Sequence, residues 1–181
     1  LESMARDAGD PARILQAVEP VNRAQKDTLF AKLQKALEGD LAGKTIAVWG
    51  LAYKPNTDDM REAPSRSLME AVWAQGGRIQ AYDPEAAKEC RRLYGQRPDL
   101  TLADDRYQAL EGADALVVCT EWKEFRVVDA AEITARLRRP LVIDGRNLYD
   151  PAVLRRAGIA YFAVGRGDSI LIRDEGGENQ A

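Results

Sequence analysis

Three cationic side chains stand in segments that follow short apolar runs, where a bound anion could meet them. Lys54 and Arg61 lie in a long charged loop after residues 45–49, and Arg146 follows residues 141–143 within the sequence DGRN. Arginine offers a planar fork to phosphate oxygens and lysine offers a point charge. Together the three would suit an anion with more than one phosphate. For any one of them alone, surface ion pairing with a neighbouring acid is the better explanation.

Several other kinds of chemistry are excluded by the residue types. Histidine, the commonest general base and metal ligand, does not occur in the sequence. The two cysteines, Cys90 and Cys119, are far apart and lack metal-site spacing, so we expect free and inert thiols in a predicted helix and at a strand end. A Walker lysine motif is also missing. We therefore predict no catalytic residue and no metal site.

The loop after residues 45–49 also lacks the signature of a dinucleotide cradle. Only Gly50 is present where G-x-G-x-x-G would be needed, so NAD binding within this domain is not expected. Asp83 ends the next β-rich run, where such a domain keeps its ribose-binding acid, but Pro84 after it favours helix capping. Trp122 and Phe125 could stack on a base, although packing is the simpler interpretation.

Composition limits the partners of the chain. Its 26 basic and 29 acidic residues give a net charge of −3, so no broad basic surface is expected to bind nucleic acid. No stretch approaches the roughly 18 apolar residues of a membrane span. Free thiols are typical of a reducing compartment, which predicts a cytoplasmic protein. The chain starts at Leu1 rather than at methionine, so we expect a fragment of a larger protein.

Short apolar runs alternate with helical punctuation along most of the chain. The predicted strands cover residues 45–49, 78–82, 100–102, 115–119, 141–143 and 160–164, of which the third is the weakest. Their continuous apolar character is typical of strands buried on both faces of a parallel sheet. Between them, residues 65–75 predict a helix, and Asp129 and Asp150 are expected to cap others. The pattern predicts an α/β fold with a doubly wound, mostly parallel Rossmann-like sheet of five to six strands.

The N-terminal part has helical periodicity from about residue 11 to residue 37. Its length favours a linker helix to another domain or subunit, and the alternative is a helix that covers the sheet. Pro20 should kink or break it. We therefore expect a linker or dimerisation helix in residues 1–40, a Rossmann-like domain in 41–166 and a flexible tail in 167–181.

Four blocks of the chain resemble a known family in order and spacing: GLAYKPNTDDMREAPS, AYDPEA, ADALVVCTEWKEF and VIDGRNLYDP. They are similar to the C-terminal, UDP-binding domain of UDP-glucose 6-dehydrogenases, in the UDP-glucose/GDP-mannose dehydrogenase family. ILQAVEPVNRAQK looks like the end of the central helix that precedes this domain. The resemblance covers about residues 11–166, and Pro20 departs from the family's usual helix former.

The resemblance implies that UDP-glucose and two NAD⁺ are converted to UDP-glucuronate, with dimerisation through the central helix. Tyr53, Lys54 and Arg146 fall where the family contacts the nucleotide sugar. Arg61 matches an arginine that reaches NAD held by the other domain. The family's G-x-G-x-x-G domain and its GGxCxxKD cysteine segment do not occur here, so the chain by itself is expected to be inactive.

Two alternatives stay open. One is a related enzyme acting on UDP-N-acetylmannosamine or GDP-mannose, since these share much of the first block. The other is a non-catalytic nucleotide-sugar-binding module with the same fold. The sequence upstream of Leu1 would distinguish an enzyme from such a module.

Overall fold

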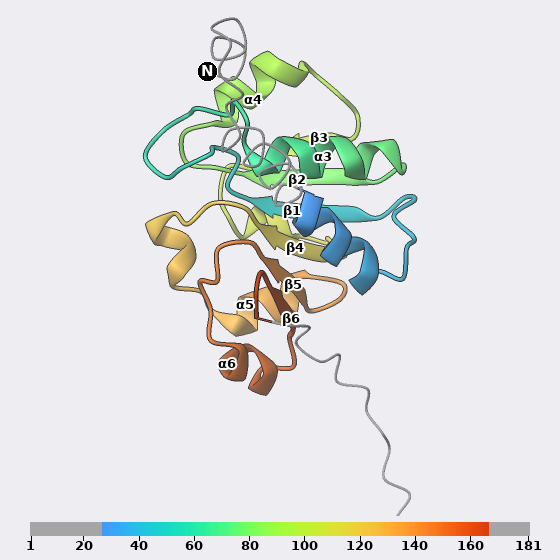
Figure 1. Ribbon diagram of the computed structural model, residues 1–181, viewed down its shortest axis with the longest axis vertical. Coiled ribbons are helices and arrows are strands. Elements are labelled where there is room, and N and C mark those ends of the chain that lie inside the picture. The colour runs from blue at the N-terminus through green and yellow to red at the C-terminus, as the bar shows by residue number, and fades with distance from the viewer. Residues whose placement is uncertain (1–26, 167–181) are drawn as a thin grey trace, which may run out of the picture.

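A single parallel sheet organises the molecule, which we describe from a computed structural model over residues 27–166. Its six strands lie in the order β3-β2-β1-β4-β5-β6, from top to bottom in Figure 1. Their bounds are Thr45–Trp49 (β1), Arg78–Tyr82 (β2), Leu100–Leu102 (β3), Ala115–Val118 (β4), Leu141–Asp144 (β5) and Ala160–Ala163 (β6). Each neighbouring pair is parallel. The predicted fold class is confirmed, and the strand ends differ from the prediction by one residue at β4, β5 and β6.

The helices begin mostly where the sequence predicts. They are α3 (Pro64–Ala74), α4 (Ala87–Tyr94), α5 (Ala130–Arg136) and α6 (Pro151–Arg156), with 3-10 turns η1 (Gln108–Leu110) and η2 (Lys123–Arg126). Asp129 and Asp150 cap α5 and α6 by accepting hydrogen bonds from the backbone N–H groups two residues later. The expectation for Asp83 was wrong in its detail. Helix α4 starts only at Ala87, and Asp83 starts the turn before it.

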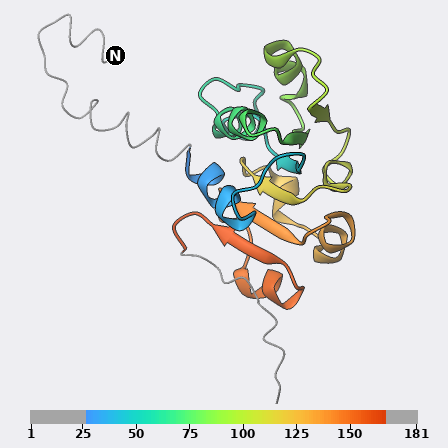
Figure 2. The ribbon, with the colours of Figure 1, turned by 90° about the vertical axis from the view of Figure 1, so that its right-hand side faces the viewer.

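Two hydrophobic cores lie on opposite faces of the sheet. Ile46 and Val48 of β1 point into the core beneath α3 and α4, whereas Ala47 and Trp49 point into the core beneath η1, η2, α5 and α6. Figure 2 shows the corresponding layers on the two sides of the strands. Because both faces of β1 are covered, all of its residues are buried, which explains its continuous apolar run.

The described part of the N-terminal helix covers the domain's own sheet. Residues 27–36 are helical, and Leu29, Leu33 and Leu37 belong to the core beneath α3. This portion therefore fits the covering-helix alternative. Pro20, the rest of the predicted linker helix and the predicted tail at 167–181 lie outside the described residues. Among the helices that are described, none has the length and apolar character needed to cross a membrane.

Candidate functional site

The loop after β1 and the loop after β4 meet where the strand order reverses. In open parallel sheets this crevice at the carboxyl ends is the usual ligand site. Gly50 has φ +90°, and a Cβ at this position would lie 2.5 Å from Thr120 Cβ. The Thr120 hydroxyl donates to the carbonyl of Ala52, and the Ser65 hydroxyl donates to the carbonyl of Leu51 at 2.6 Å. The start of the β1 loop is therefore held close to the β4 loop.

Asp83 at the end of β2 holds the same segment from the other side. Its Oδ2 accepts from the N–H groups of Leu51 at 2.7 Å and Ala52 at 3.1 Å, and from the indole Nε1 of Trp122 at 3.1 Å. Its Oδ1 accepts from the two N–H groups of the turn before α4, at 2.9 and 2.8 Å. Asp83 is buried, with 4% of the residue exposed. Both oxygens are thus used within the protein, so this acid is not presented to a ribose.

A second buried carboxylate shapes the loop that carries Arg146. Asp144, at the end of β5, accepts from the N–H groups of Arg146 at 2.8 Å and Leu148 at 2.7 Å, and from the Tyr161 hydroxyl at 2.8 Å. Asn147 has φ +57°, and its amide donates to the carbonyl of Val164 at 3.0 Å. These contacts turn the chain sharply after β5 and fix the direction in which the Arg146 side chain leaves it.

Arg146 forms an ion pair with Glu121 of the β4 loop. The hydrogen bond from Arg146 lowers the pKa of Glu121. Both residues line a cavity of about 320 Å³ together with Arg126, Gly145, Asn147 and Leu148. Arg126 and Asn147 were not among the residues predicted to bind the anion. Arg126 directly follows the block ADALVVCTEWKEF, and this adjacency was the available signal.

Tyr53 and Lys54 approach the same region from the β1 loop. The Tyr53 side chain is 46% exposed, and the Lys54 Nζ atom lies 5.7 Å from the centroid of its ring. Glu121 is the main cause of the raised pKa of Arg146, and Tyr53 is close enough to contribute electrostatically. Among the described residues, no carboxylate lies within ion-pair distance of Lys54. Tyr53, Lys54 and Arg146 thus all lie in loops after the carboxyl ends of the strands, and no described contact joins Arg146 to the other two.

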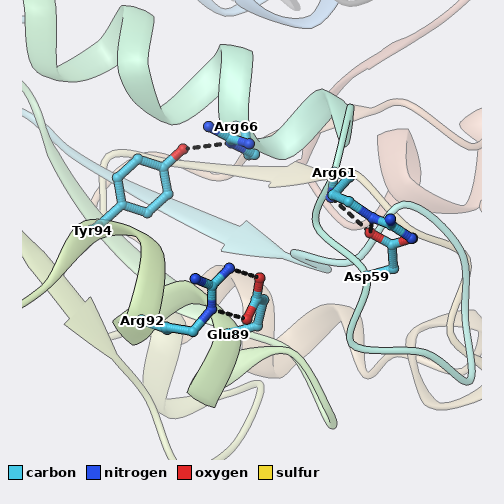
Figure 3. Close-up of polar contacts among 6 residues, drawn as sticks. All are labelled: Asp59, Arg61, Arg66, Glu89, Arg92 and Tyr94. Carbon is cyan, nitrogen blue, oxygen red and sulfur yellow. Dashed lines mark hydrogen bonds and ion pairs between the residues drawn. The ribbon is translucent and has the colours of Figure 1, made fainter.

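Arg61 lies at the other end of the loop and is already paired. Its Nε and one terminal nitrogen donate to the two carboxylate oxygens of Asp59, at 3.0 and 2.8 Å. These hydrogen bonds lower the pKa of Asp59 to about 2. Figure 3 shows this pair near α4, where Glu89 is held by Arg92. The surface-pairing alternative therefore describes Arg61 in this structure, and no described contact joins it to Arg146.

The aromatic residues of the β4 loop pack inside the protein. Phe125 is fully buried and stacks on Trp49, with 5.2 Å between the ring centroids. Trp122 is 7% exposed, and its indole nitrogen is used by Asp83. Packing, rather than stacking on a base, is confirmed for both side chains.

Neither cysteine is in an activating environment. Burial raises the pKa of Cys90 in α4 to about 11 and that of Cys119 after β4 to about 12. Both thiols are free and buried, which agrees with the expectation of inert thiols. Within residues 27–166, no cluster of acidic, cysteine or histidine side chains could hold a metal ion.

We expect both thiols to resist alkylation in the folded chain. A raised pKa leaves little thiolate at pH 8, and burial blocks access to the sulfur. Thiol-reactive reagent should label Cys90 and Cys119 slowly in buffer and fully in denaturant, as followed by mass spectrometry. Rapid stoichiometric labelling of either cysteine in the folded chain would contradict the buried environments described above.

Comparison with known proteins identifies what the chain is similar to. The model of the UDP-glucose/GDP-mannose dehydrogenase family, UDP binding domain, matches residues 47–151. A UDP-glucose 6-dehydrogenase of Pseudomonas aeruginosa is 47% identical over 165 residues, which cover 90% of this chain and 36% of the relative. The structure of a UDP-glucose dehydrogenase from the hyperthermophilic archaeon Pyrobaculum islandicum has a TM-score of 0.73 at 28% identity, over 89% of this chain and 34% of that one.

A further solved structure, of a UDP-D-ManNAc dehydrogenase from Pyrococcus horikoshii, has a TM-score of 0.60 at 29% identity. It covers 80% of this chain and 31% of that one. The chain therefore spans only about a third of the length of the relatives that it matches.

Proposed function

Because this chain belongs to the UDP-glucose/GDP-mannose dehydrogenase family and matches its UDP-binding domain, we propose that the carboxyl edge of the sheet binds the UDP part of a nucleotide sugar. The observation that carries the proposal is the cavity lined by Arg146 and Arg126, among the loops that follow the carboxyl ends of the strands. Positive charge gathered at one sheet edge suits a diphosphate, since the net charge of −3 supplies no general attraction for anions.

Arg146, Lys54 and Tyr53 can each make a different contact with the nucleotide. Arg146 offers its guanidinium fork to phosphate oxygens, and Lys54 adds a mobile point charge. Tyr53, next to Lys54 in the sequence, can pack an exposed ring against the ligand. Glu121 already occupies part of the Arg146 guanidinium. A phosphate must therefore use the remaining N–H groups or displace this carboxylate.

For the whole protein we propose the reaction of a UDP-glucose 6-dehydrogenase, in which UDP-glucose, two NAD⁺ and water give UDP-glucuronate and two NADH. This chain contributes binding and orientation of the nucleotide, which positions the sugar for reaction. The residues present do not fit a dinucleotide. Gly50 does not begin a G-x-G-x-x-G motif, and the carboxylate of Asp83 already accepts hydrogen bonds from Leu51 and Trp122. NAD is therefore assigned to a part of the protein outside this chain, and Arg61 is proposed to reach it by exchanging its pairing with Asp59.

The same proposal includes the division of the chain and its setting. Residues 41–166 are the UDP-sugar-binding domain, and residues 1–40 are the end of a central helix that packs on this sheet through Leu29, Leu33 and Leu37 and also joins two copies. The family resemblance supports this dimer. A cytoplasmic location is supported by the two free thiols, since reducing compartments keep cysteines unpaired.

Calorimetric titration of the 181-residue chain tests the ligand. We expect UDP to bind weakly but more tightly than NAD⁺, because the cations gathered at the sheet edge suit a diphosphate and no cradle for NAD is present. Uridine, which lacks the phosphates, is the matched control and should bind more weakly than UDP. If NAD⁺ bound more tightly than UDP, the assignment of the site would be wrong.

A second candidate is a related nucleotide-sugar enzyme, which the similarity to the UDP-D-ManNAc dehydrogenase structure favours. Enzymes acting on UDP-glucose and on UDP-N-acetylmannosamine both require UDP binding, so the sugar must be distinguished with the whole protein. NADH formation from UDP-glucose, with UDP-N-acetylmannosamine and GDP-mannose as competing substrates, separates them. A whole protein that binds UDP without forming NADH from any of these would instead be a nucleotide-sugar-binding module.

A further inference from the structure

The buried carboxylate of Asp83 connects the loops after β1 and β4. We infer that Asp83 is a positioning residue for UDP binding, which braces the β1 and β4 loops and so fixes the segment that leads directly to Tyr53 and Lys54. The inference rests on the proposed function of the site. It assigns a role in ligand binding to a side chain that does not contact the ligand.

One oxygen atom joins two loops that are distant in the sequence. Oδ2 accepts from Leu51 and Ala52 in the loop after β1 and from Trp122 in the loop after β4. Oδ1 holds the turn that begins at Asp83 itself. Among the described residues, no lysine or arginine forms an ion pair with this carboxylate. Its negative charge is therefore stabilised by N–H donors, which form stronger hydrogen bonds with an ionised acceptor than with a neutral one.

The brace acts directly before the proposed binding residues. Ala52 is followed by Tyr53, whose N–H donates to the carbonyl of Asp59 at 2.9 Å, so the returning part of the loop is held against the same segment. A loop of this length would lose considerable conformational entropy if it were ordered only when ligand binds. Fixing Leu51 and Ala52 in advance reduces that loss and raises the affinity.

Substitution by asparagine removes this brace with little change in volume. Asparagine has one acceptor oxygen and one NH₂ group, whereas both oxygens of Asp83 face N–H donors. In either orientation of the amide, at least two hydrogen bonds are replaced by opposed donors. We expect Asp83→Asn to weaken UDP binding about tenfold or more, as measured by calorimetry.

Asp114 provides a matched control at the opposite, amino end of the strands, directly before β4. It is 9% exposed, and its Oδ2 accepts from the N–H of Thr45 at 2.8 Å, before β1 rather than after it. Asp114→Asn should lower the melting temperature, as Asp83→Asn does, but should change UDP affinity less than twofold. Equal losses of affinity in the two variants would show that Asp83 acts only through stability, and would overturn the inference.

Hydrogen exchange provides a readout that needs no UDP. In Asp83→Asn we expect faster exchange at the amides of Leu51 and Ala52 and unchanged exchange at Thr45, with the reverse in Asp114→Asn. If the unsubstituted chain failed to bind UDP, the proposed function would fail, while this exchange pattern would still test the brace. Unchanged exchange at Leu51 and Ala52, or UDP affinity within twofold in folded Asp83→Asn, would overturn the inference.

Should Asp83→Asn fail to fold, Trp122→Phe decides the question. It removes one donor to Asp83 and keeps an aromatic ring at the buried position. The inference expects a loss of UDP affinity of about threefold or more, together with faster exchange at Ala52. Affinity and exchange equal to those of the unsubstituted chain would refute the role of the brace.

Discussion

Arg146→Ala is expected to weaken UDP binding by about one to two orders of magnitude in a calorimetric titration. Hydrogen bonds to charged groups contribute about 1.5–3 kcal/mol each, which corresponds to roughly 10- to 150-fold in affinity. The effect should lie toward the upper end, because Glu121 lines the same cavity and loses its partner. Its unpaired carboxylate would then repel the phosphates.

Two further variants separate charge from geometry and from general effects. Arg146→Lys keeps the charge but loses the planar fork, so its UDP affinity should fall between those of Arg146→Ala and the unsubstituted chain. Arg92 is paired in a similar way with Glu89, at 2.7 Å, but lies in α4 away from the cavity. Arg92→Ala should bind UDP normally. Normal UDP binding by Arg146→Ala would remove this residue from the site.

Gly50→Ala should lower the free energy of unfolding by about 2–5 kcal/mol. The left-handed backbone, φ +90°, costs a residue with a Cβ about 1–2 kcal/mol, and forcing atoms into a packed region adds about 1–3 kcal/mol. The new Cβ would lie 2.5–2.7 Å from the Cβ, backbone nitrogen and hydroxyl of Thr120. Urea denaturation followed by circular dichroism measures the loss.

Gly158→Ala isolates the contribution of the backbone alone. Gly158, after α6, also has a positive φ, +75°, but a Cβ there meets nothing within 4 Å. Its substitution should cost about 1–2 kcal/mol. The β1 turn cannot relax easily, because the N–H of Gly50 donates to the carbonyl of Tyr82 at 2.9 Å. Equal losses in the two variants would show that contact with Thr120 is unimportant.

The elements of the fold follow from local patterns. Residues 46–49 and 115–118 are apolar at every position and lie in central strands buried on both faces. Asp129 and Asp150 cap helices by bonds to N–H groups two residues away, so a short stretch of sequence contains both partners. For Asp83 the sequence indicated only the local N–H partners in the following turn, and the distant donors to its other oxygen were missed.

The family membership confirms the resemblance carried by the four sequence blocks. The roles of Tyr53, Lys54, Arg61 and Arg146 remain predictions. The structure adds one cation, Arg126, because the cavity is lined by two loops whose approach no local pattern encodes.

The sequence alone determined the strands, most helix starts, the absence of a dinucleotide cradle and the residue types available for an anion. These depend on the order of apolar and polar groups and on contacts between near neighbours. Tertiary structure decided the strand order, the pairing of Arg146 with Glu121 and the use of Asp83 as a brace. Each joins groups that are far apart in the chain, and packing of the whole sheet is what places them within hydrogen-bonding distance.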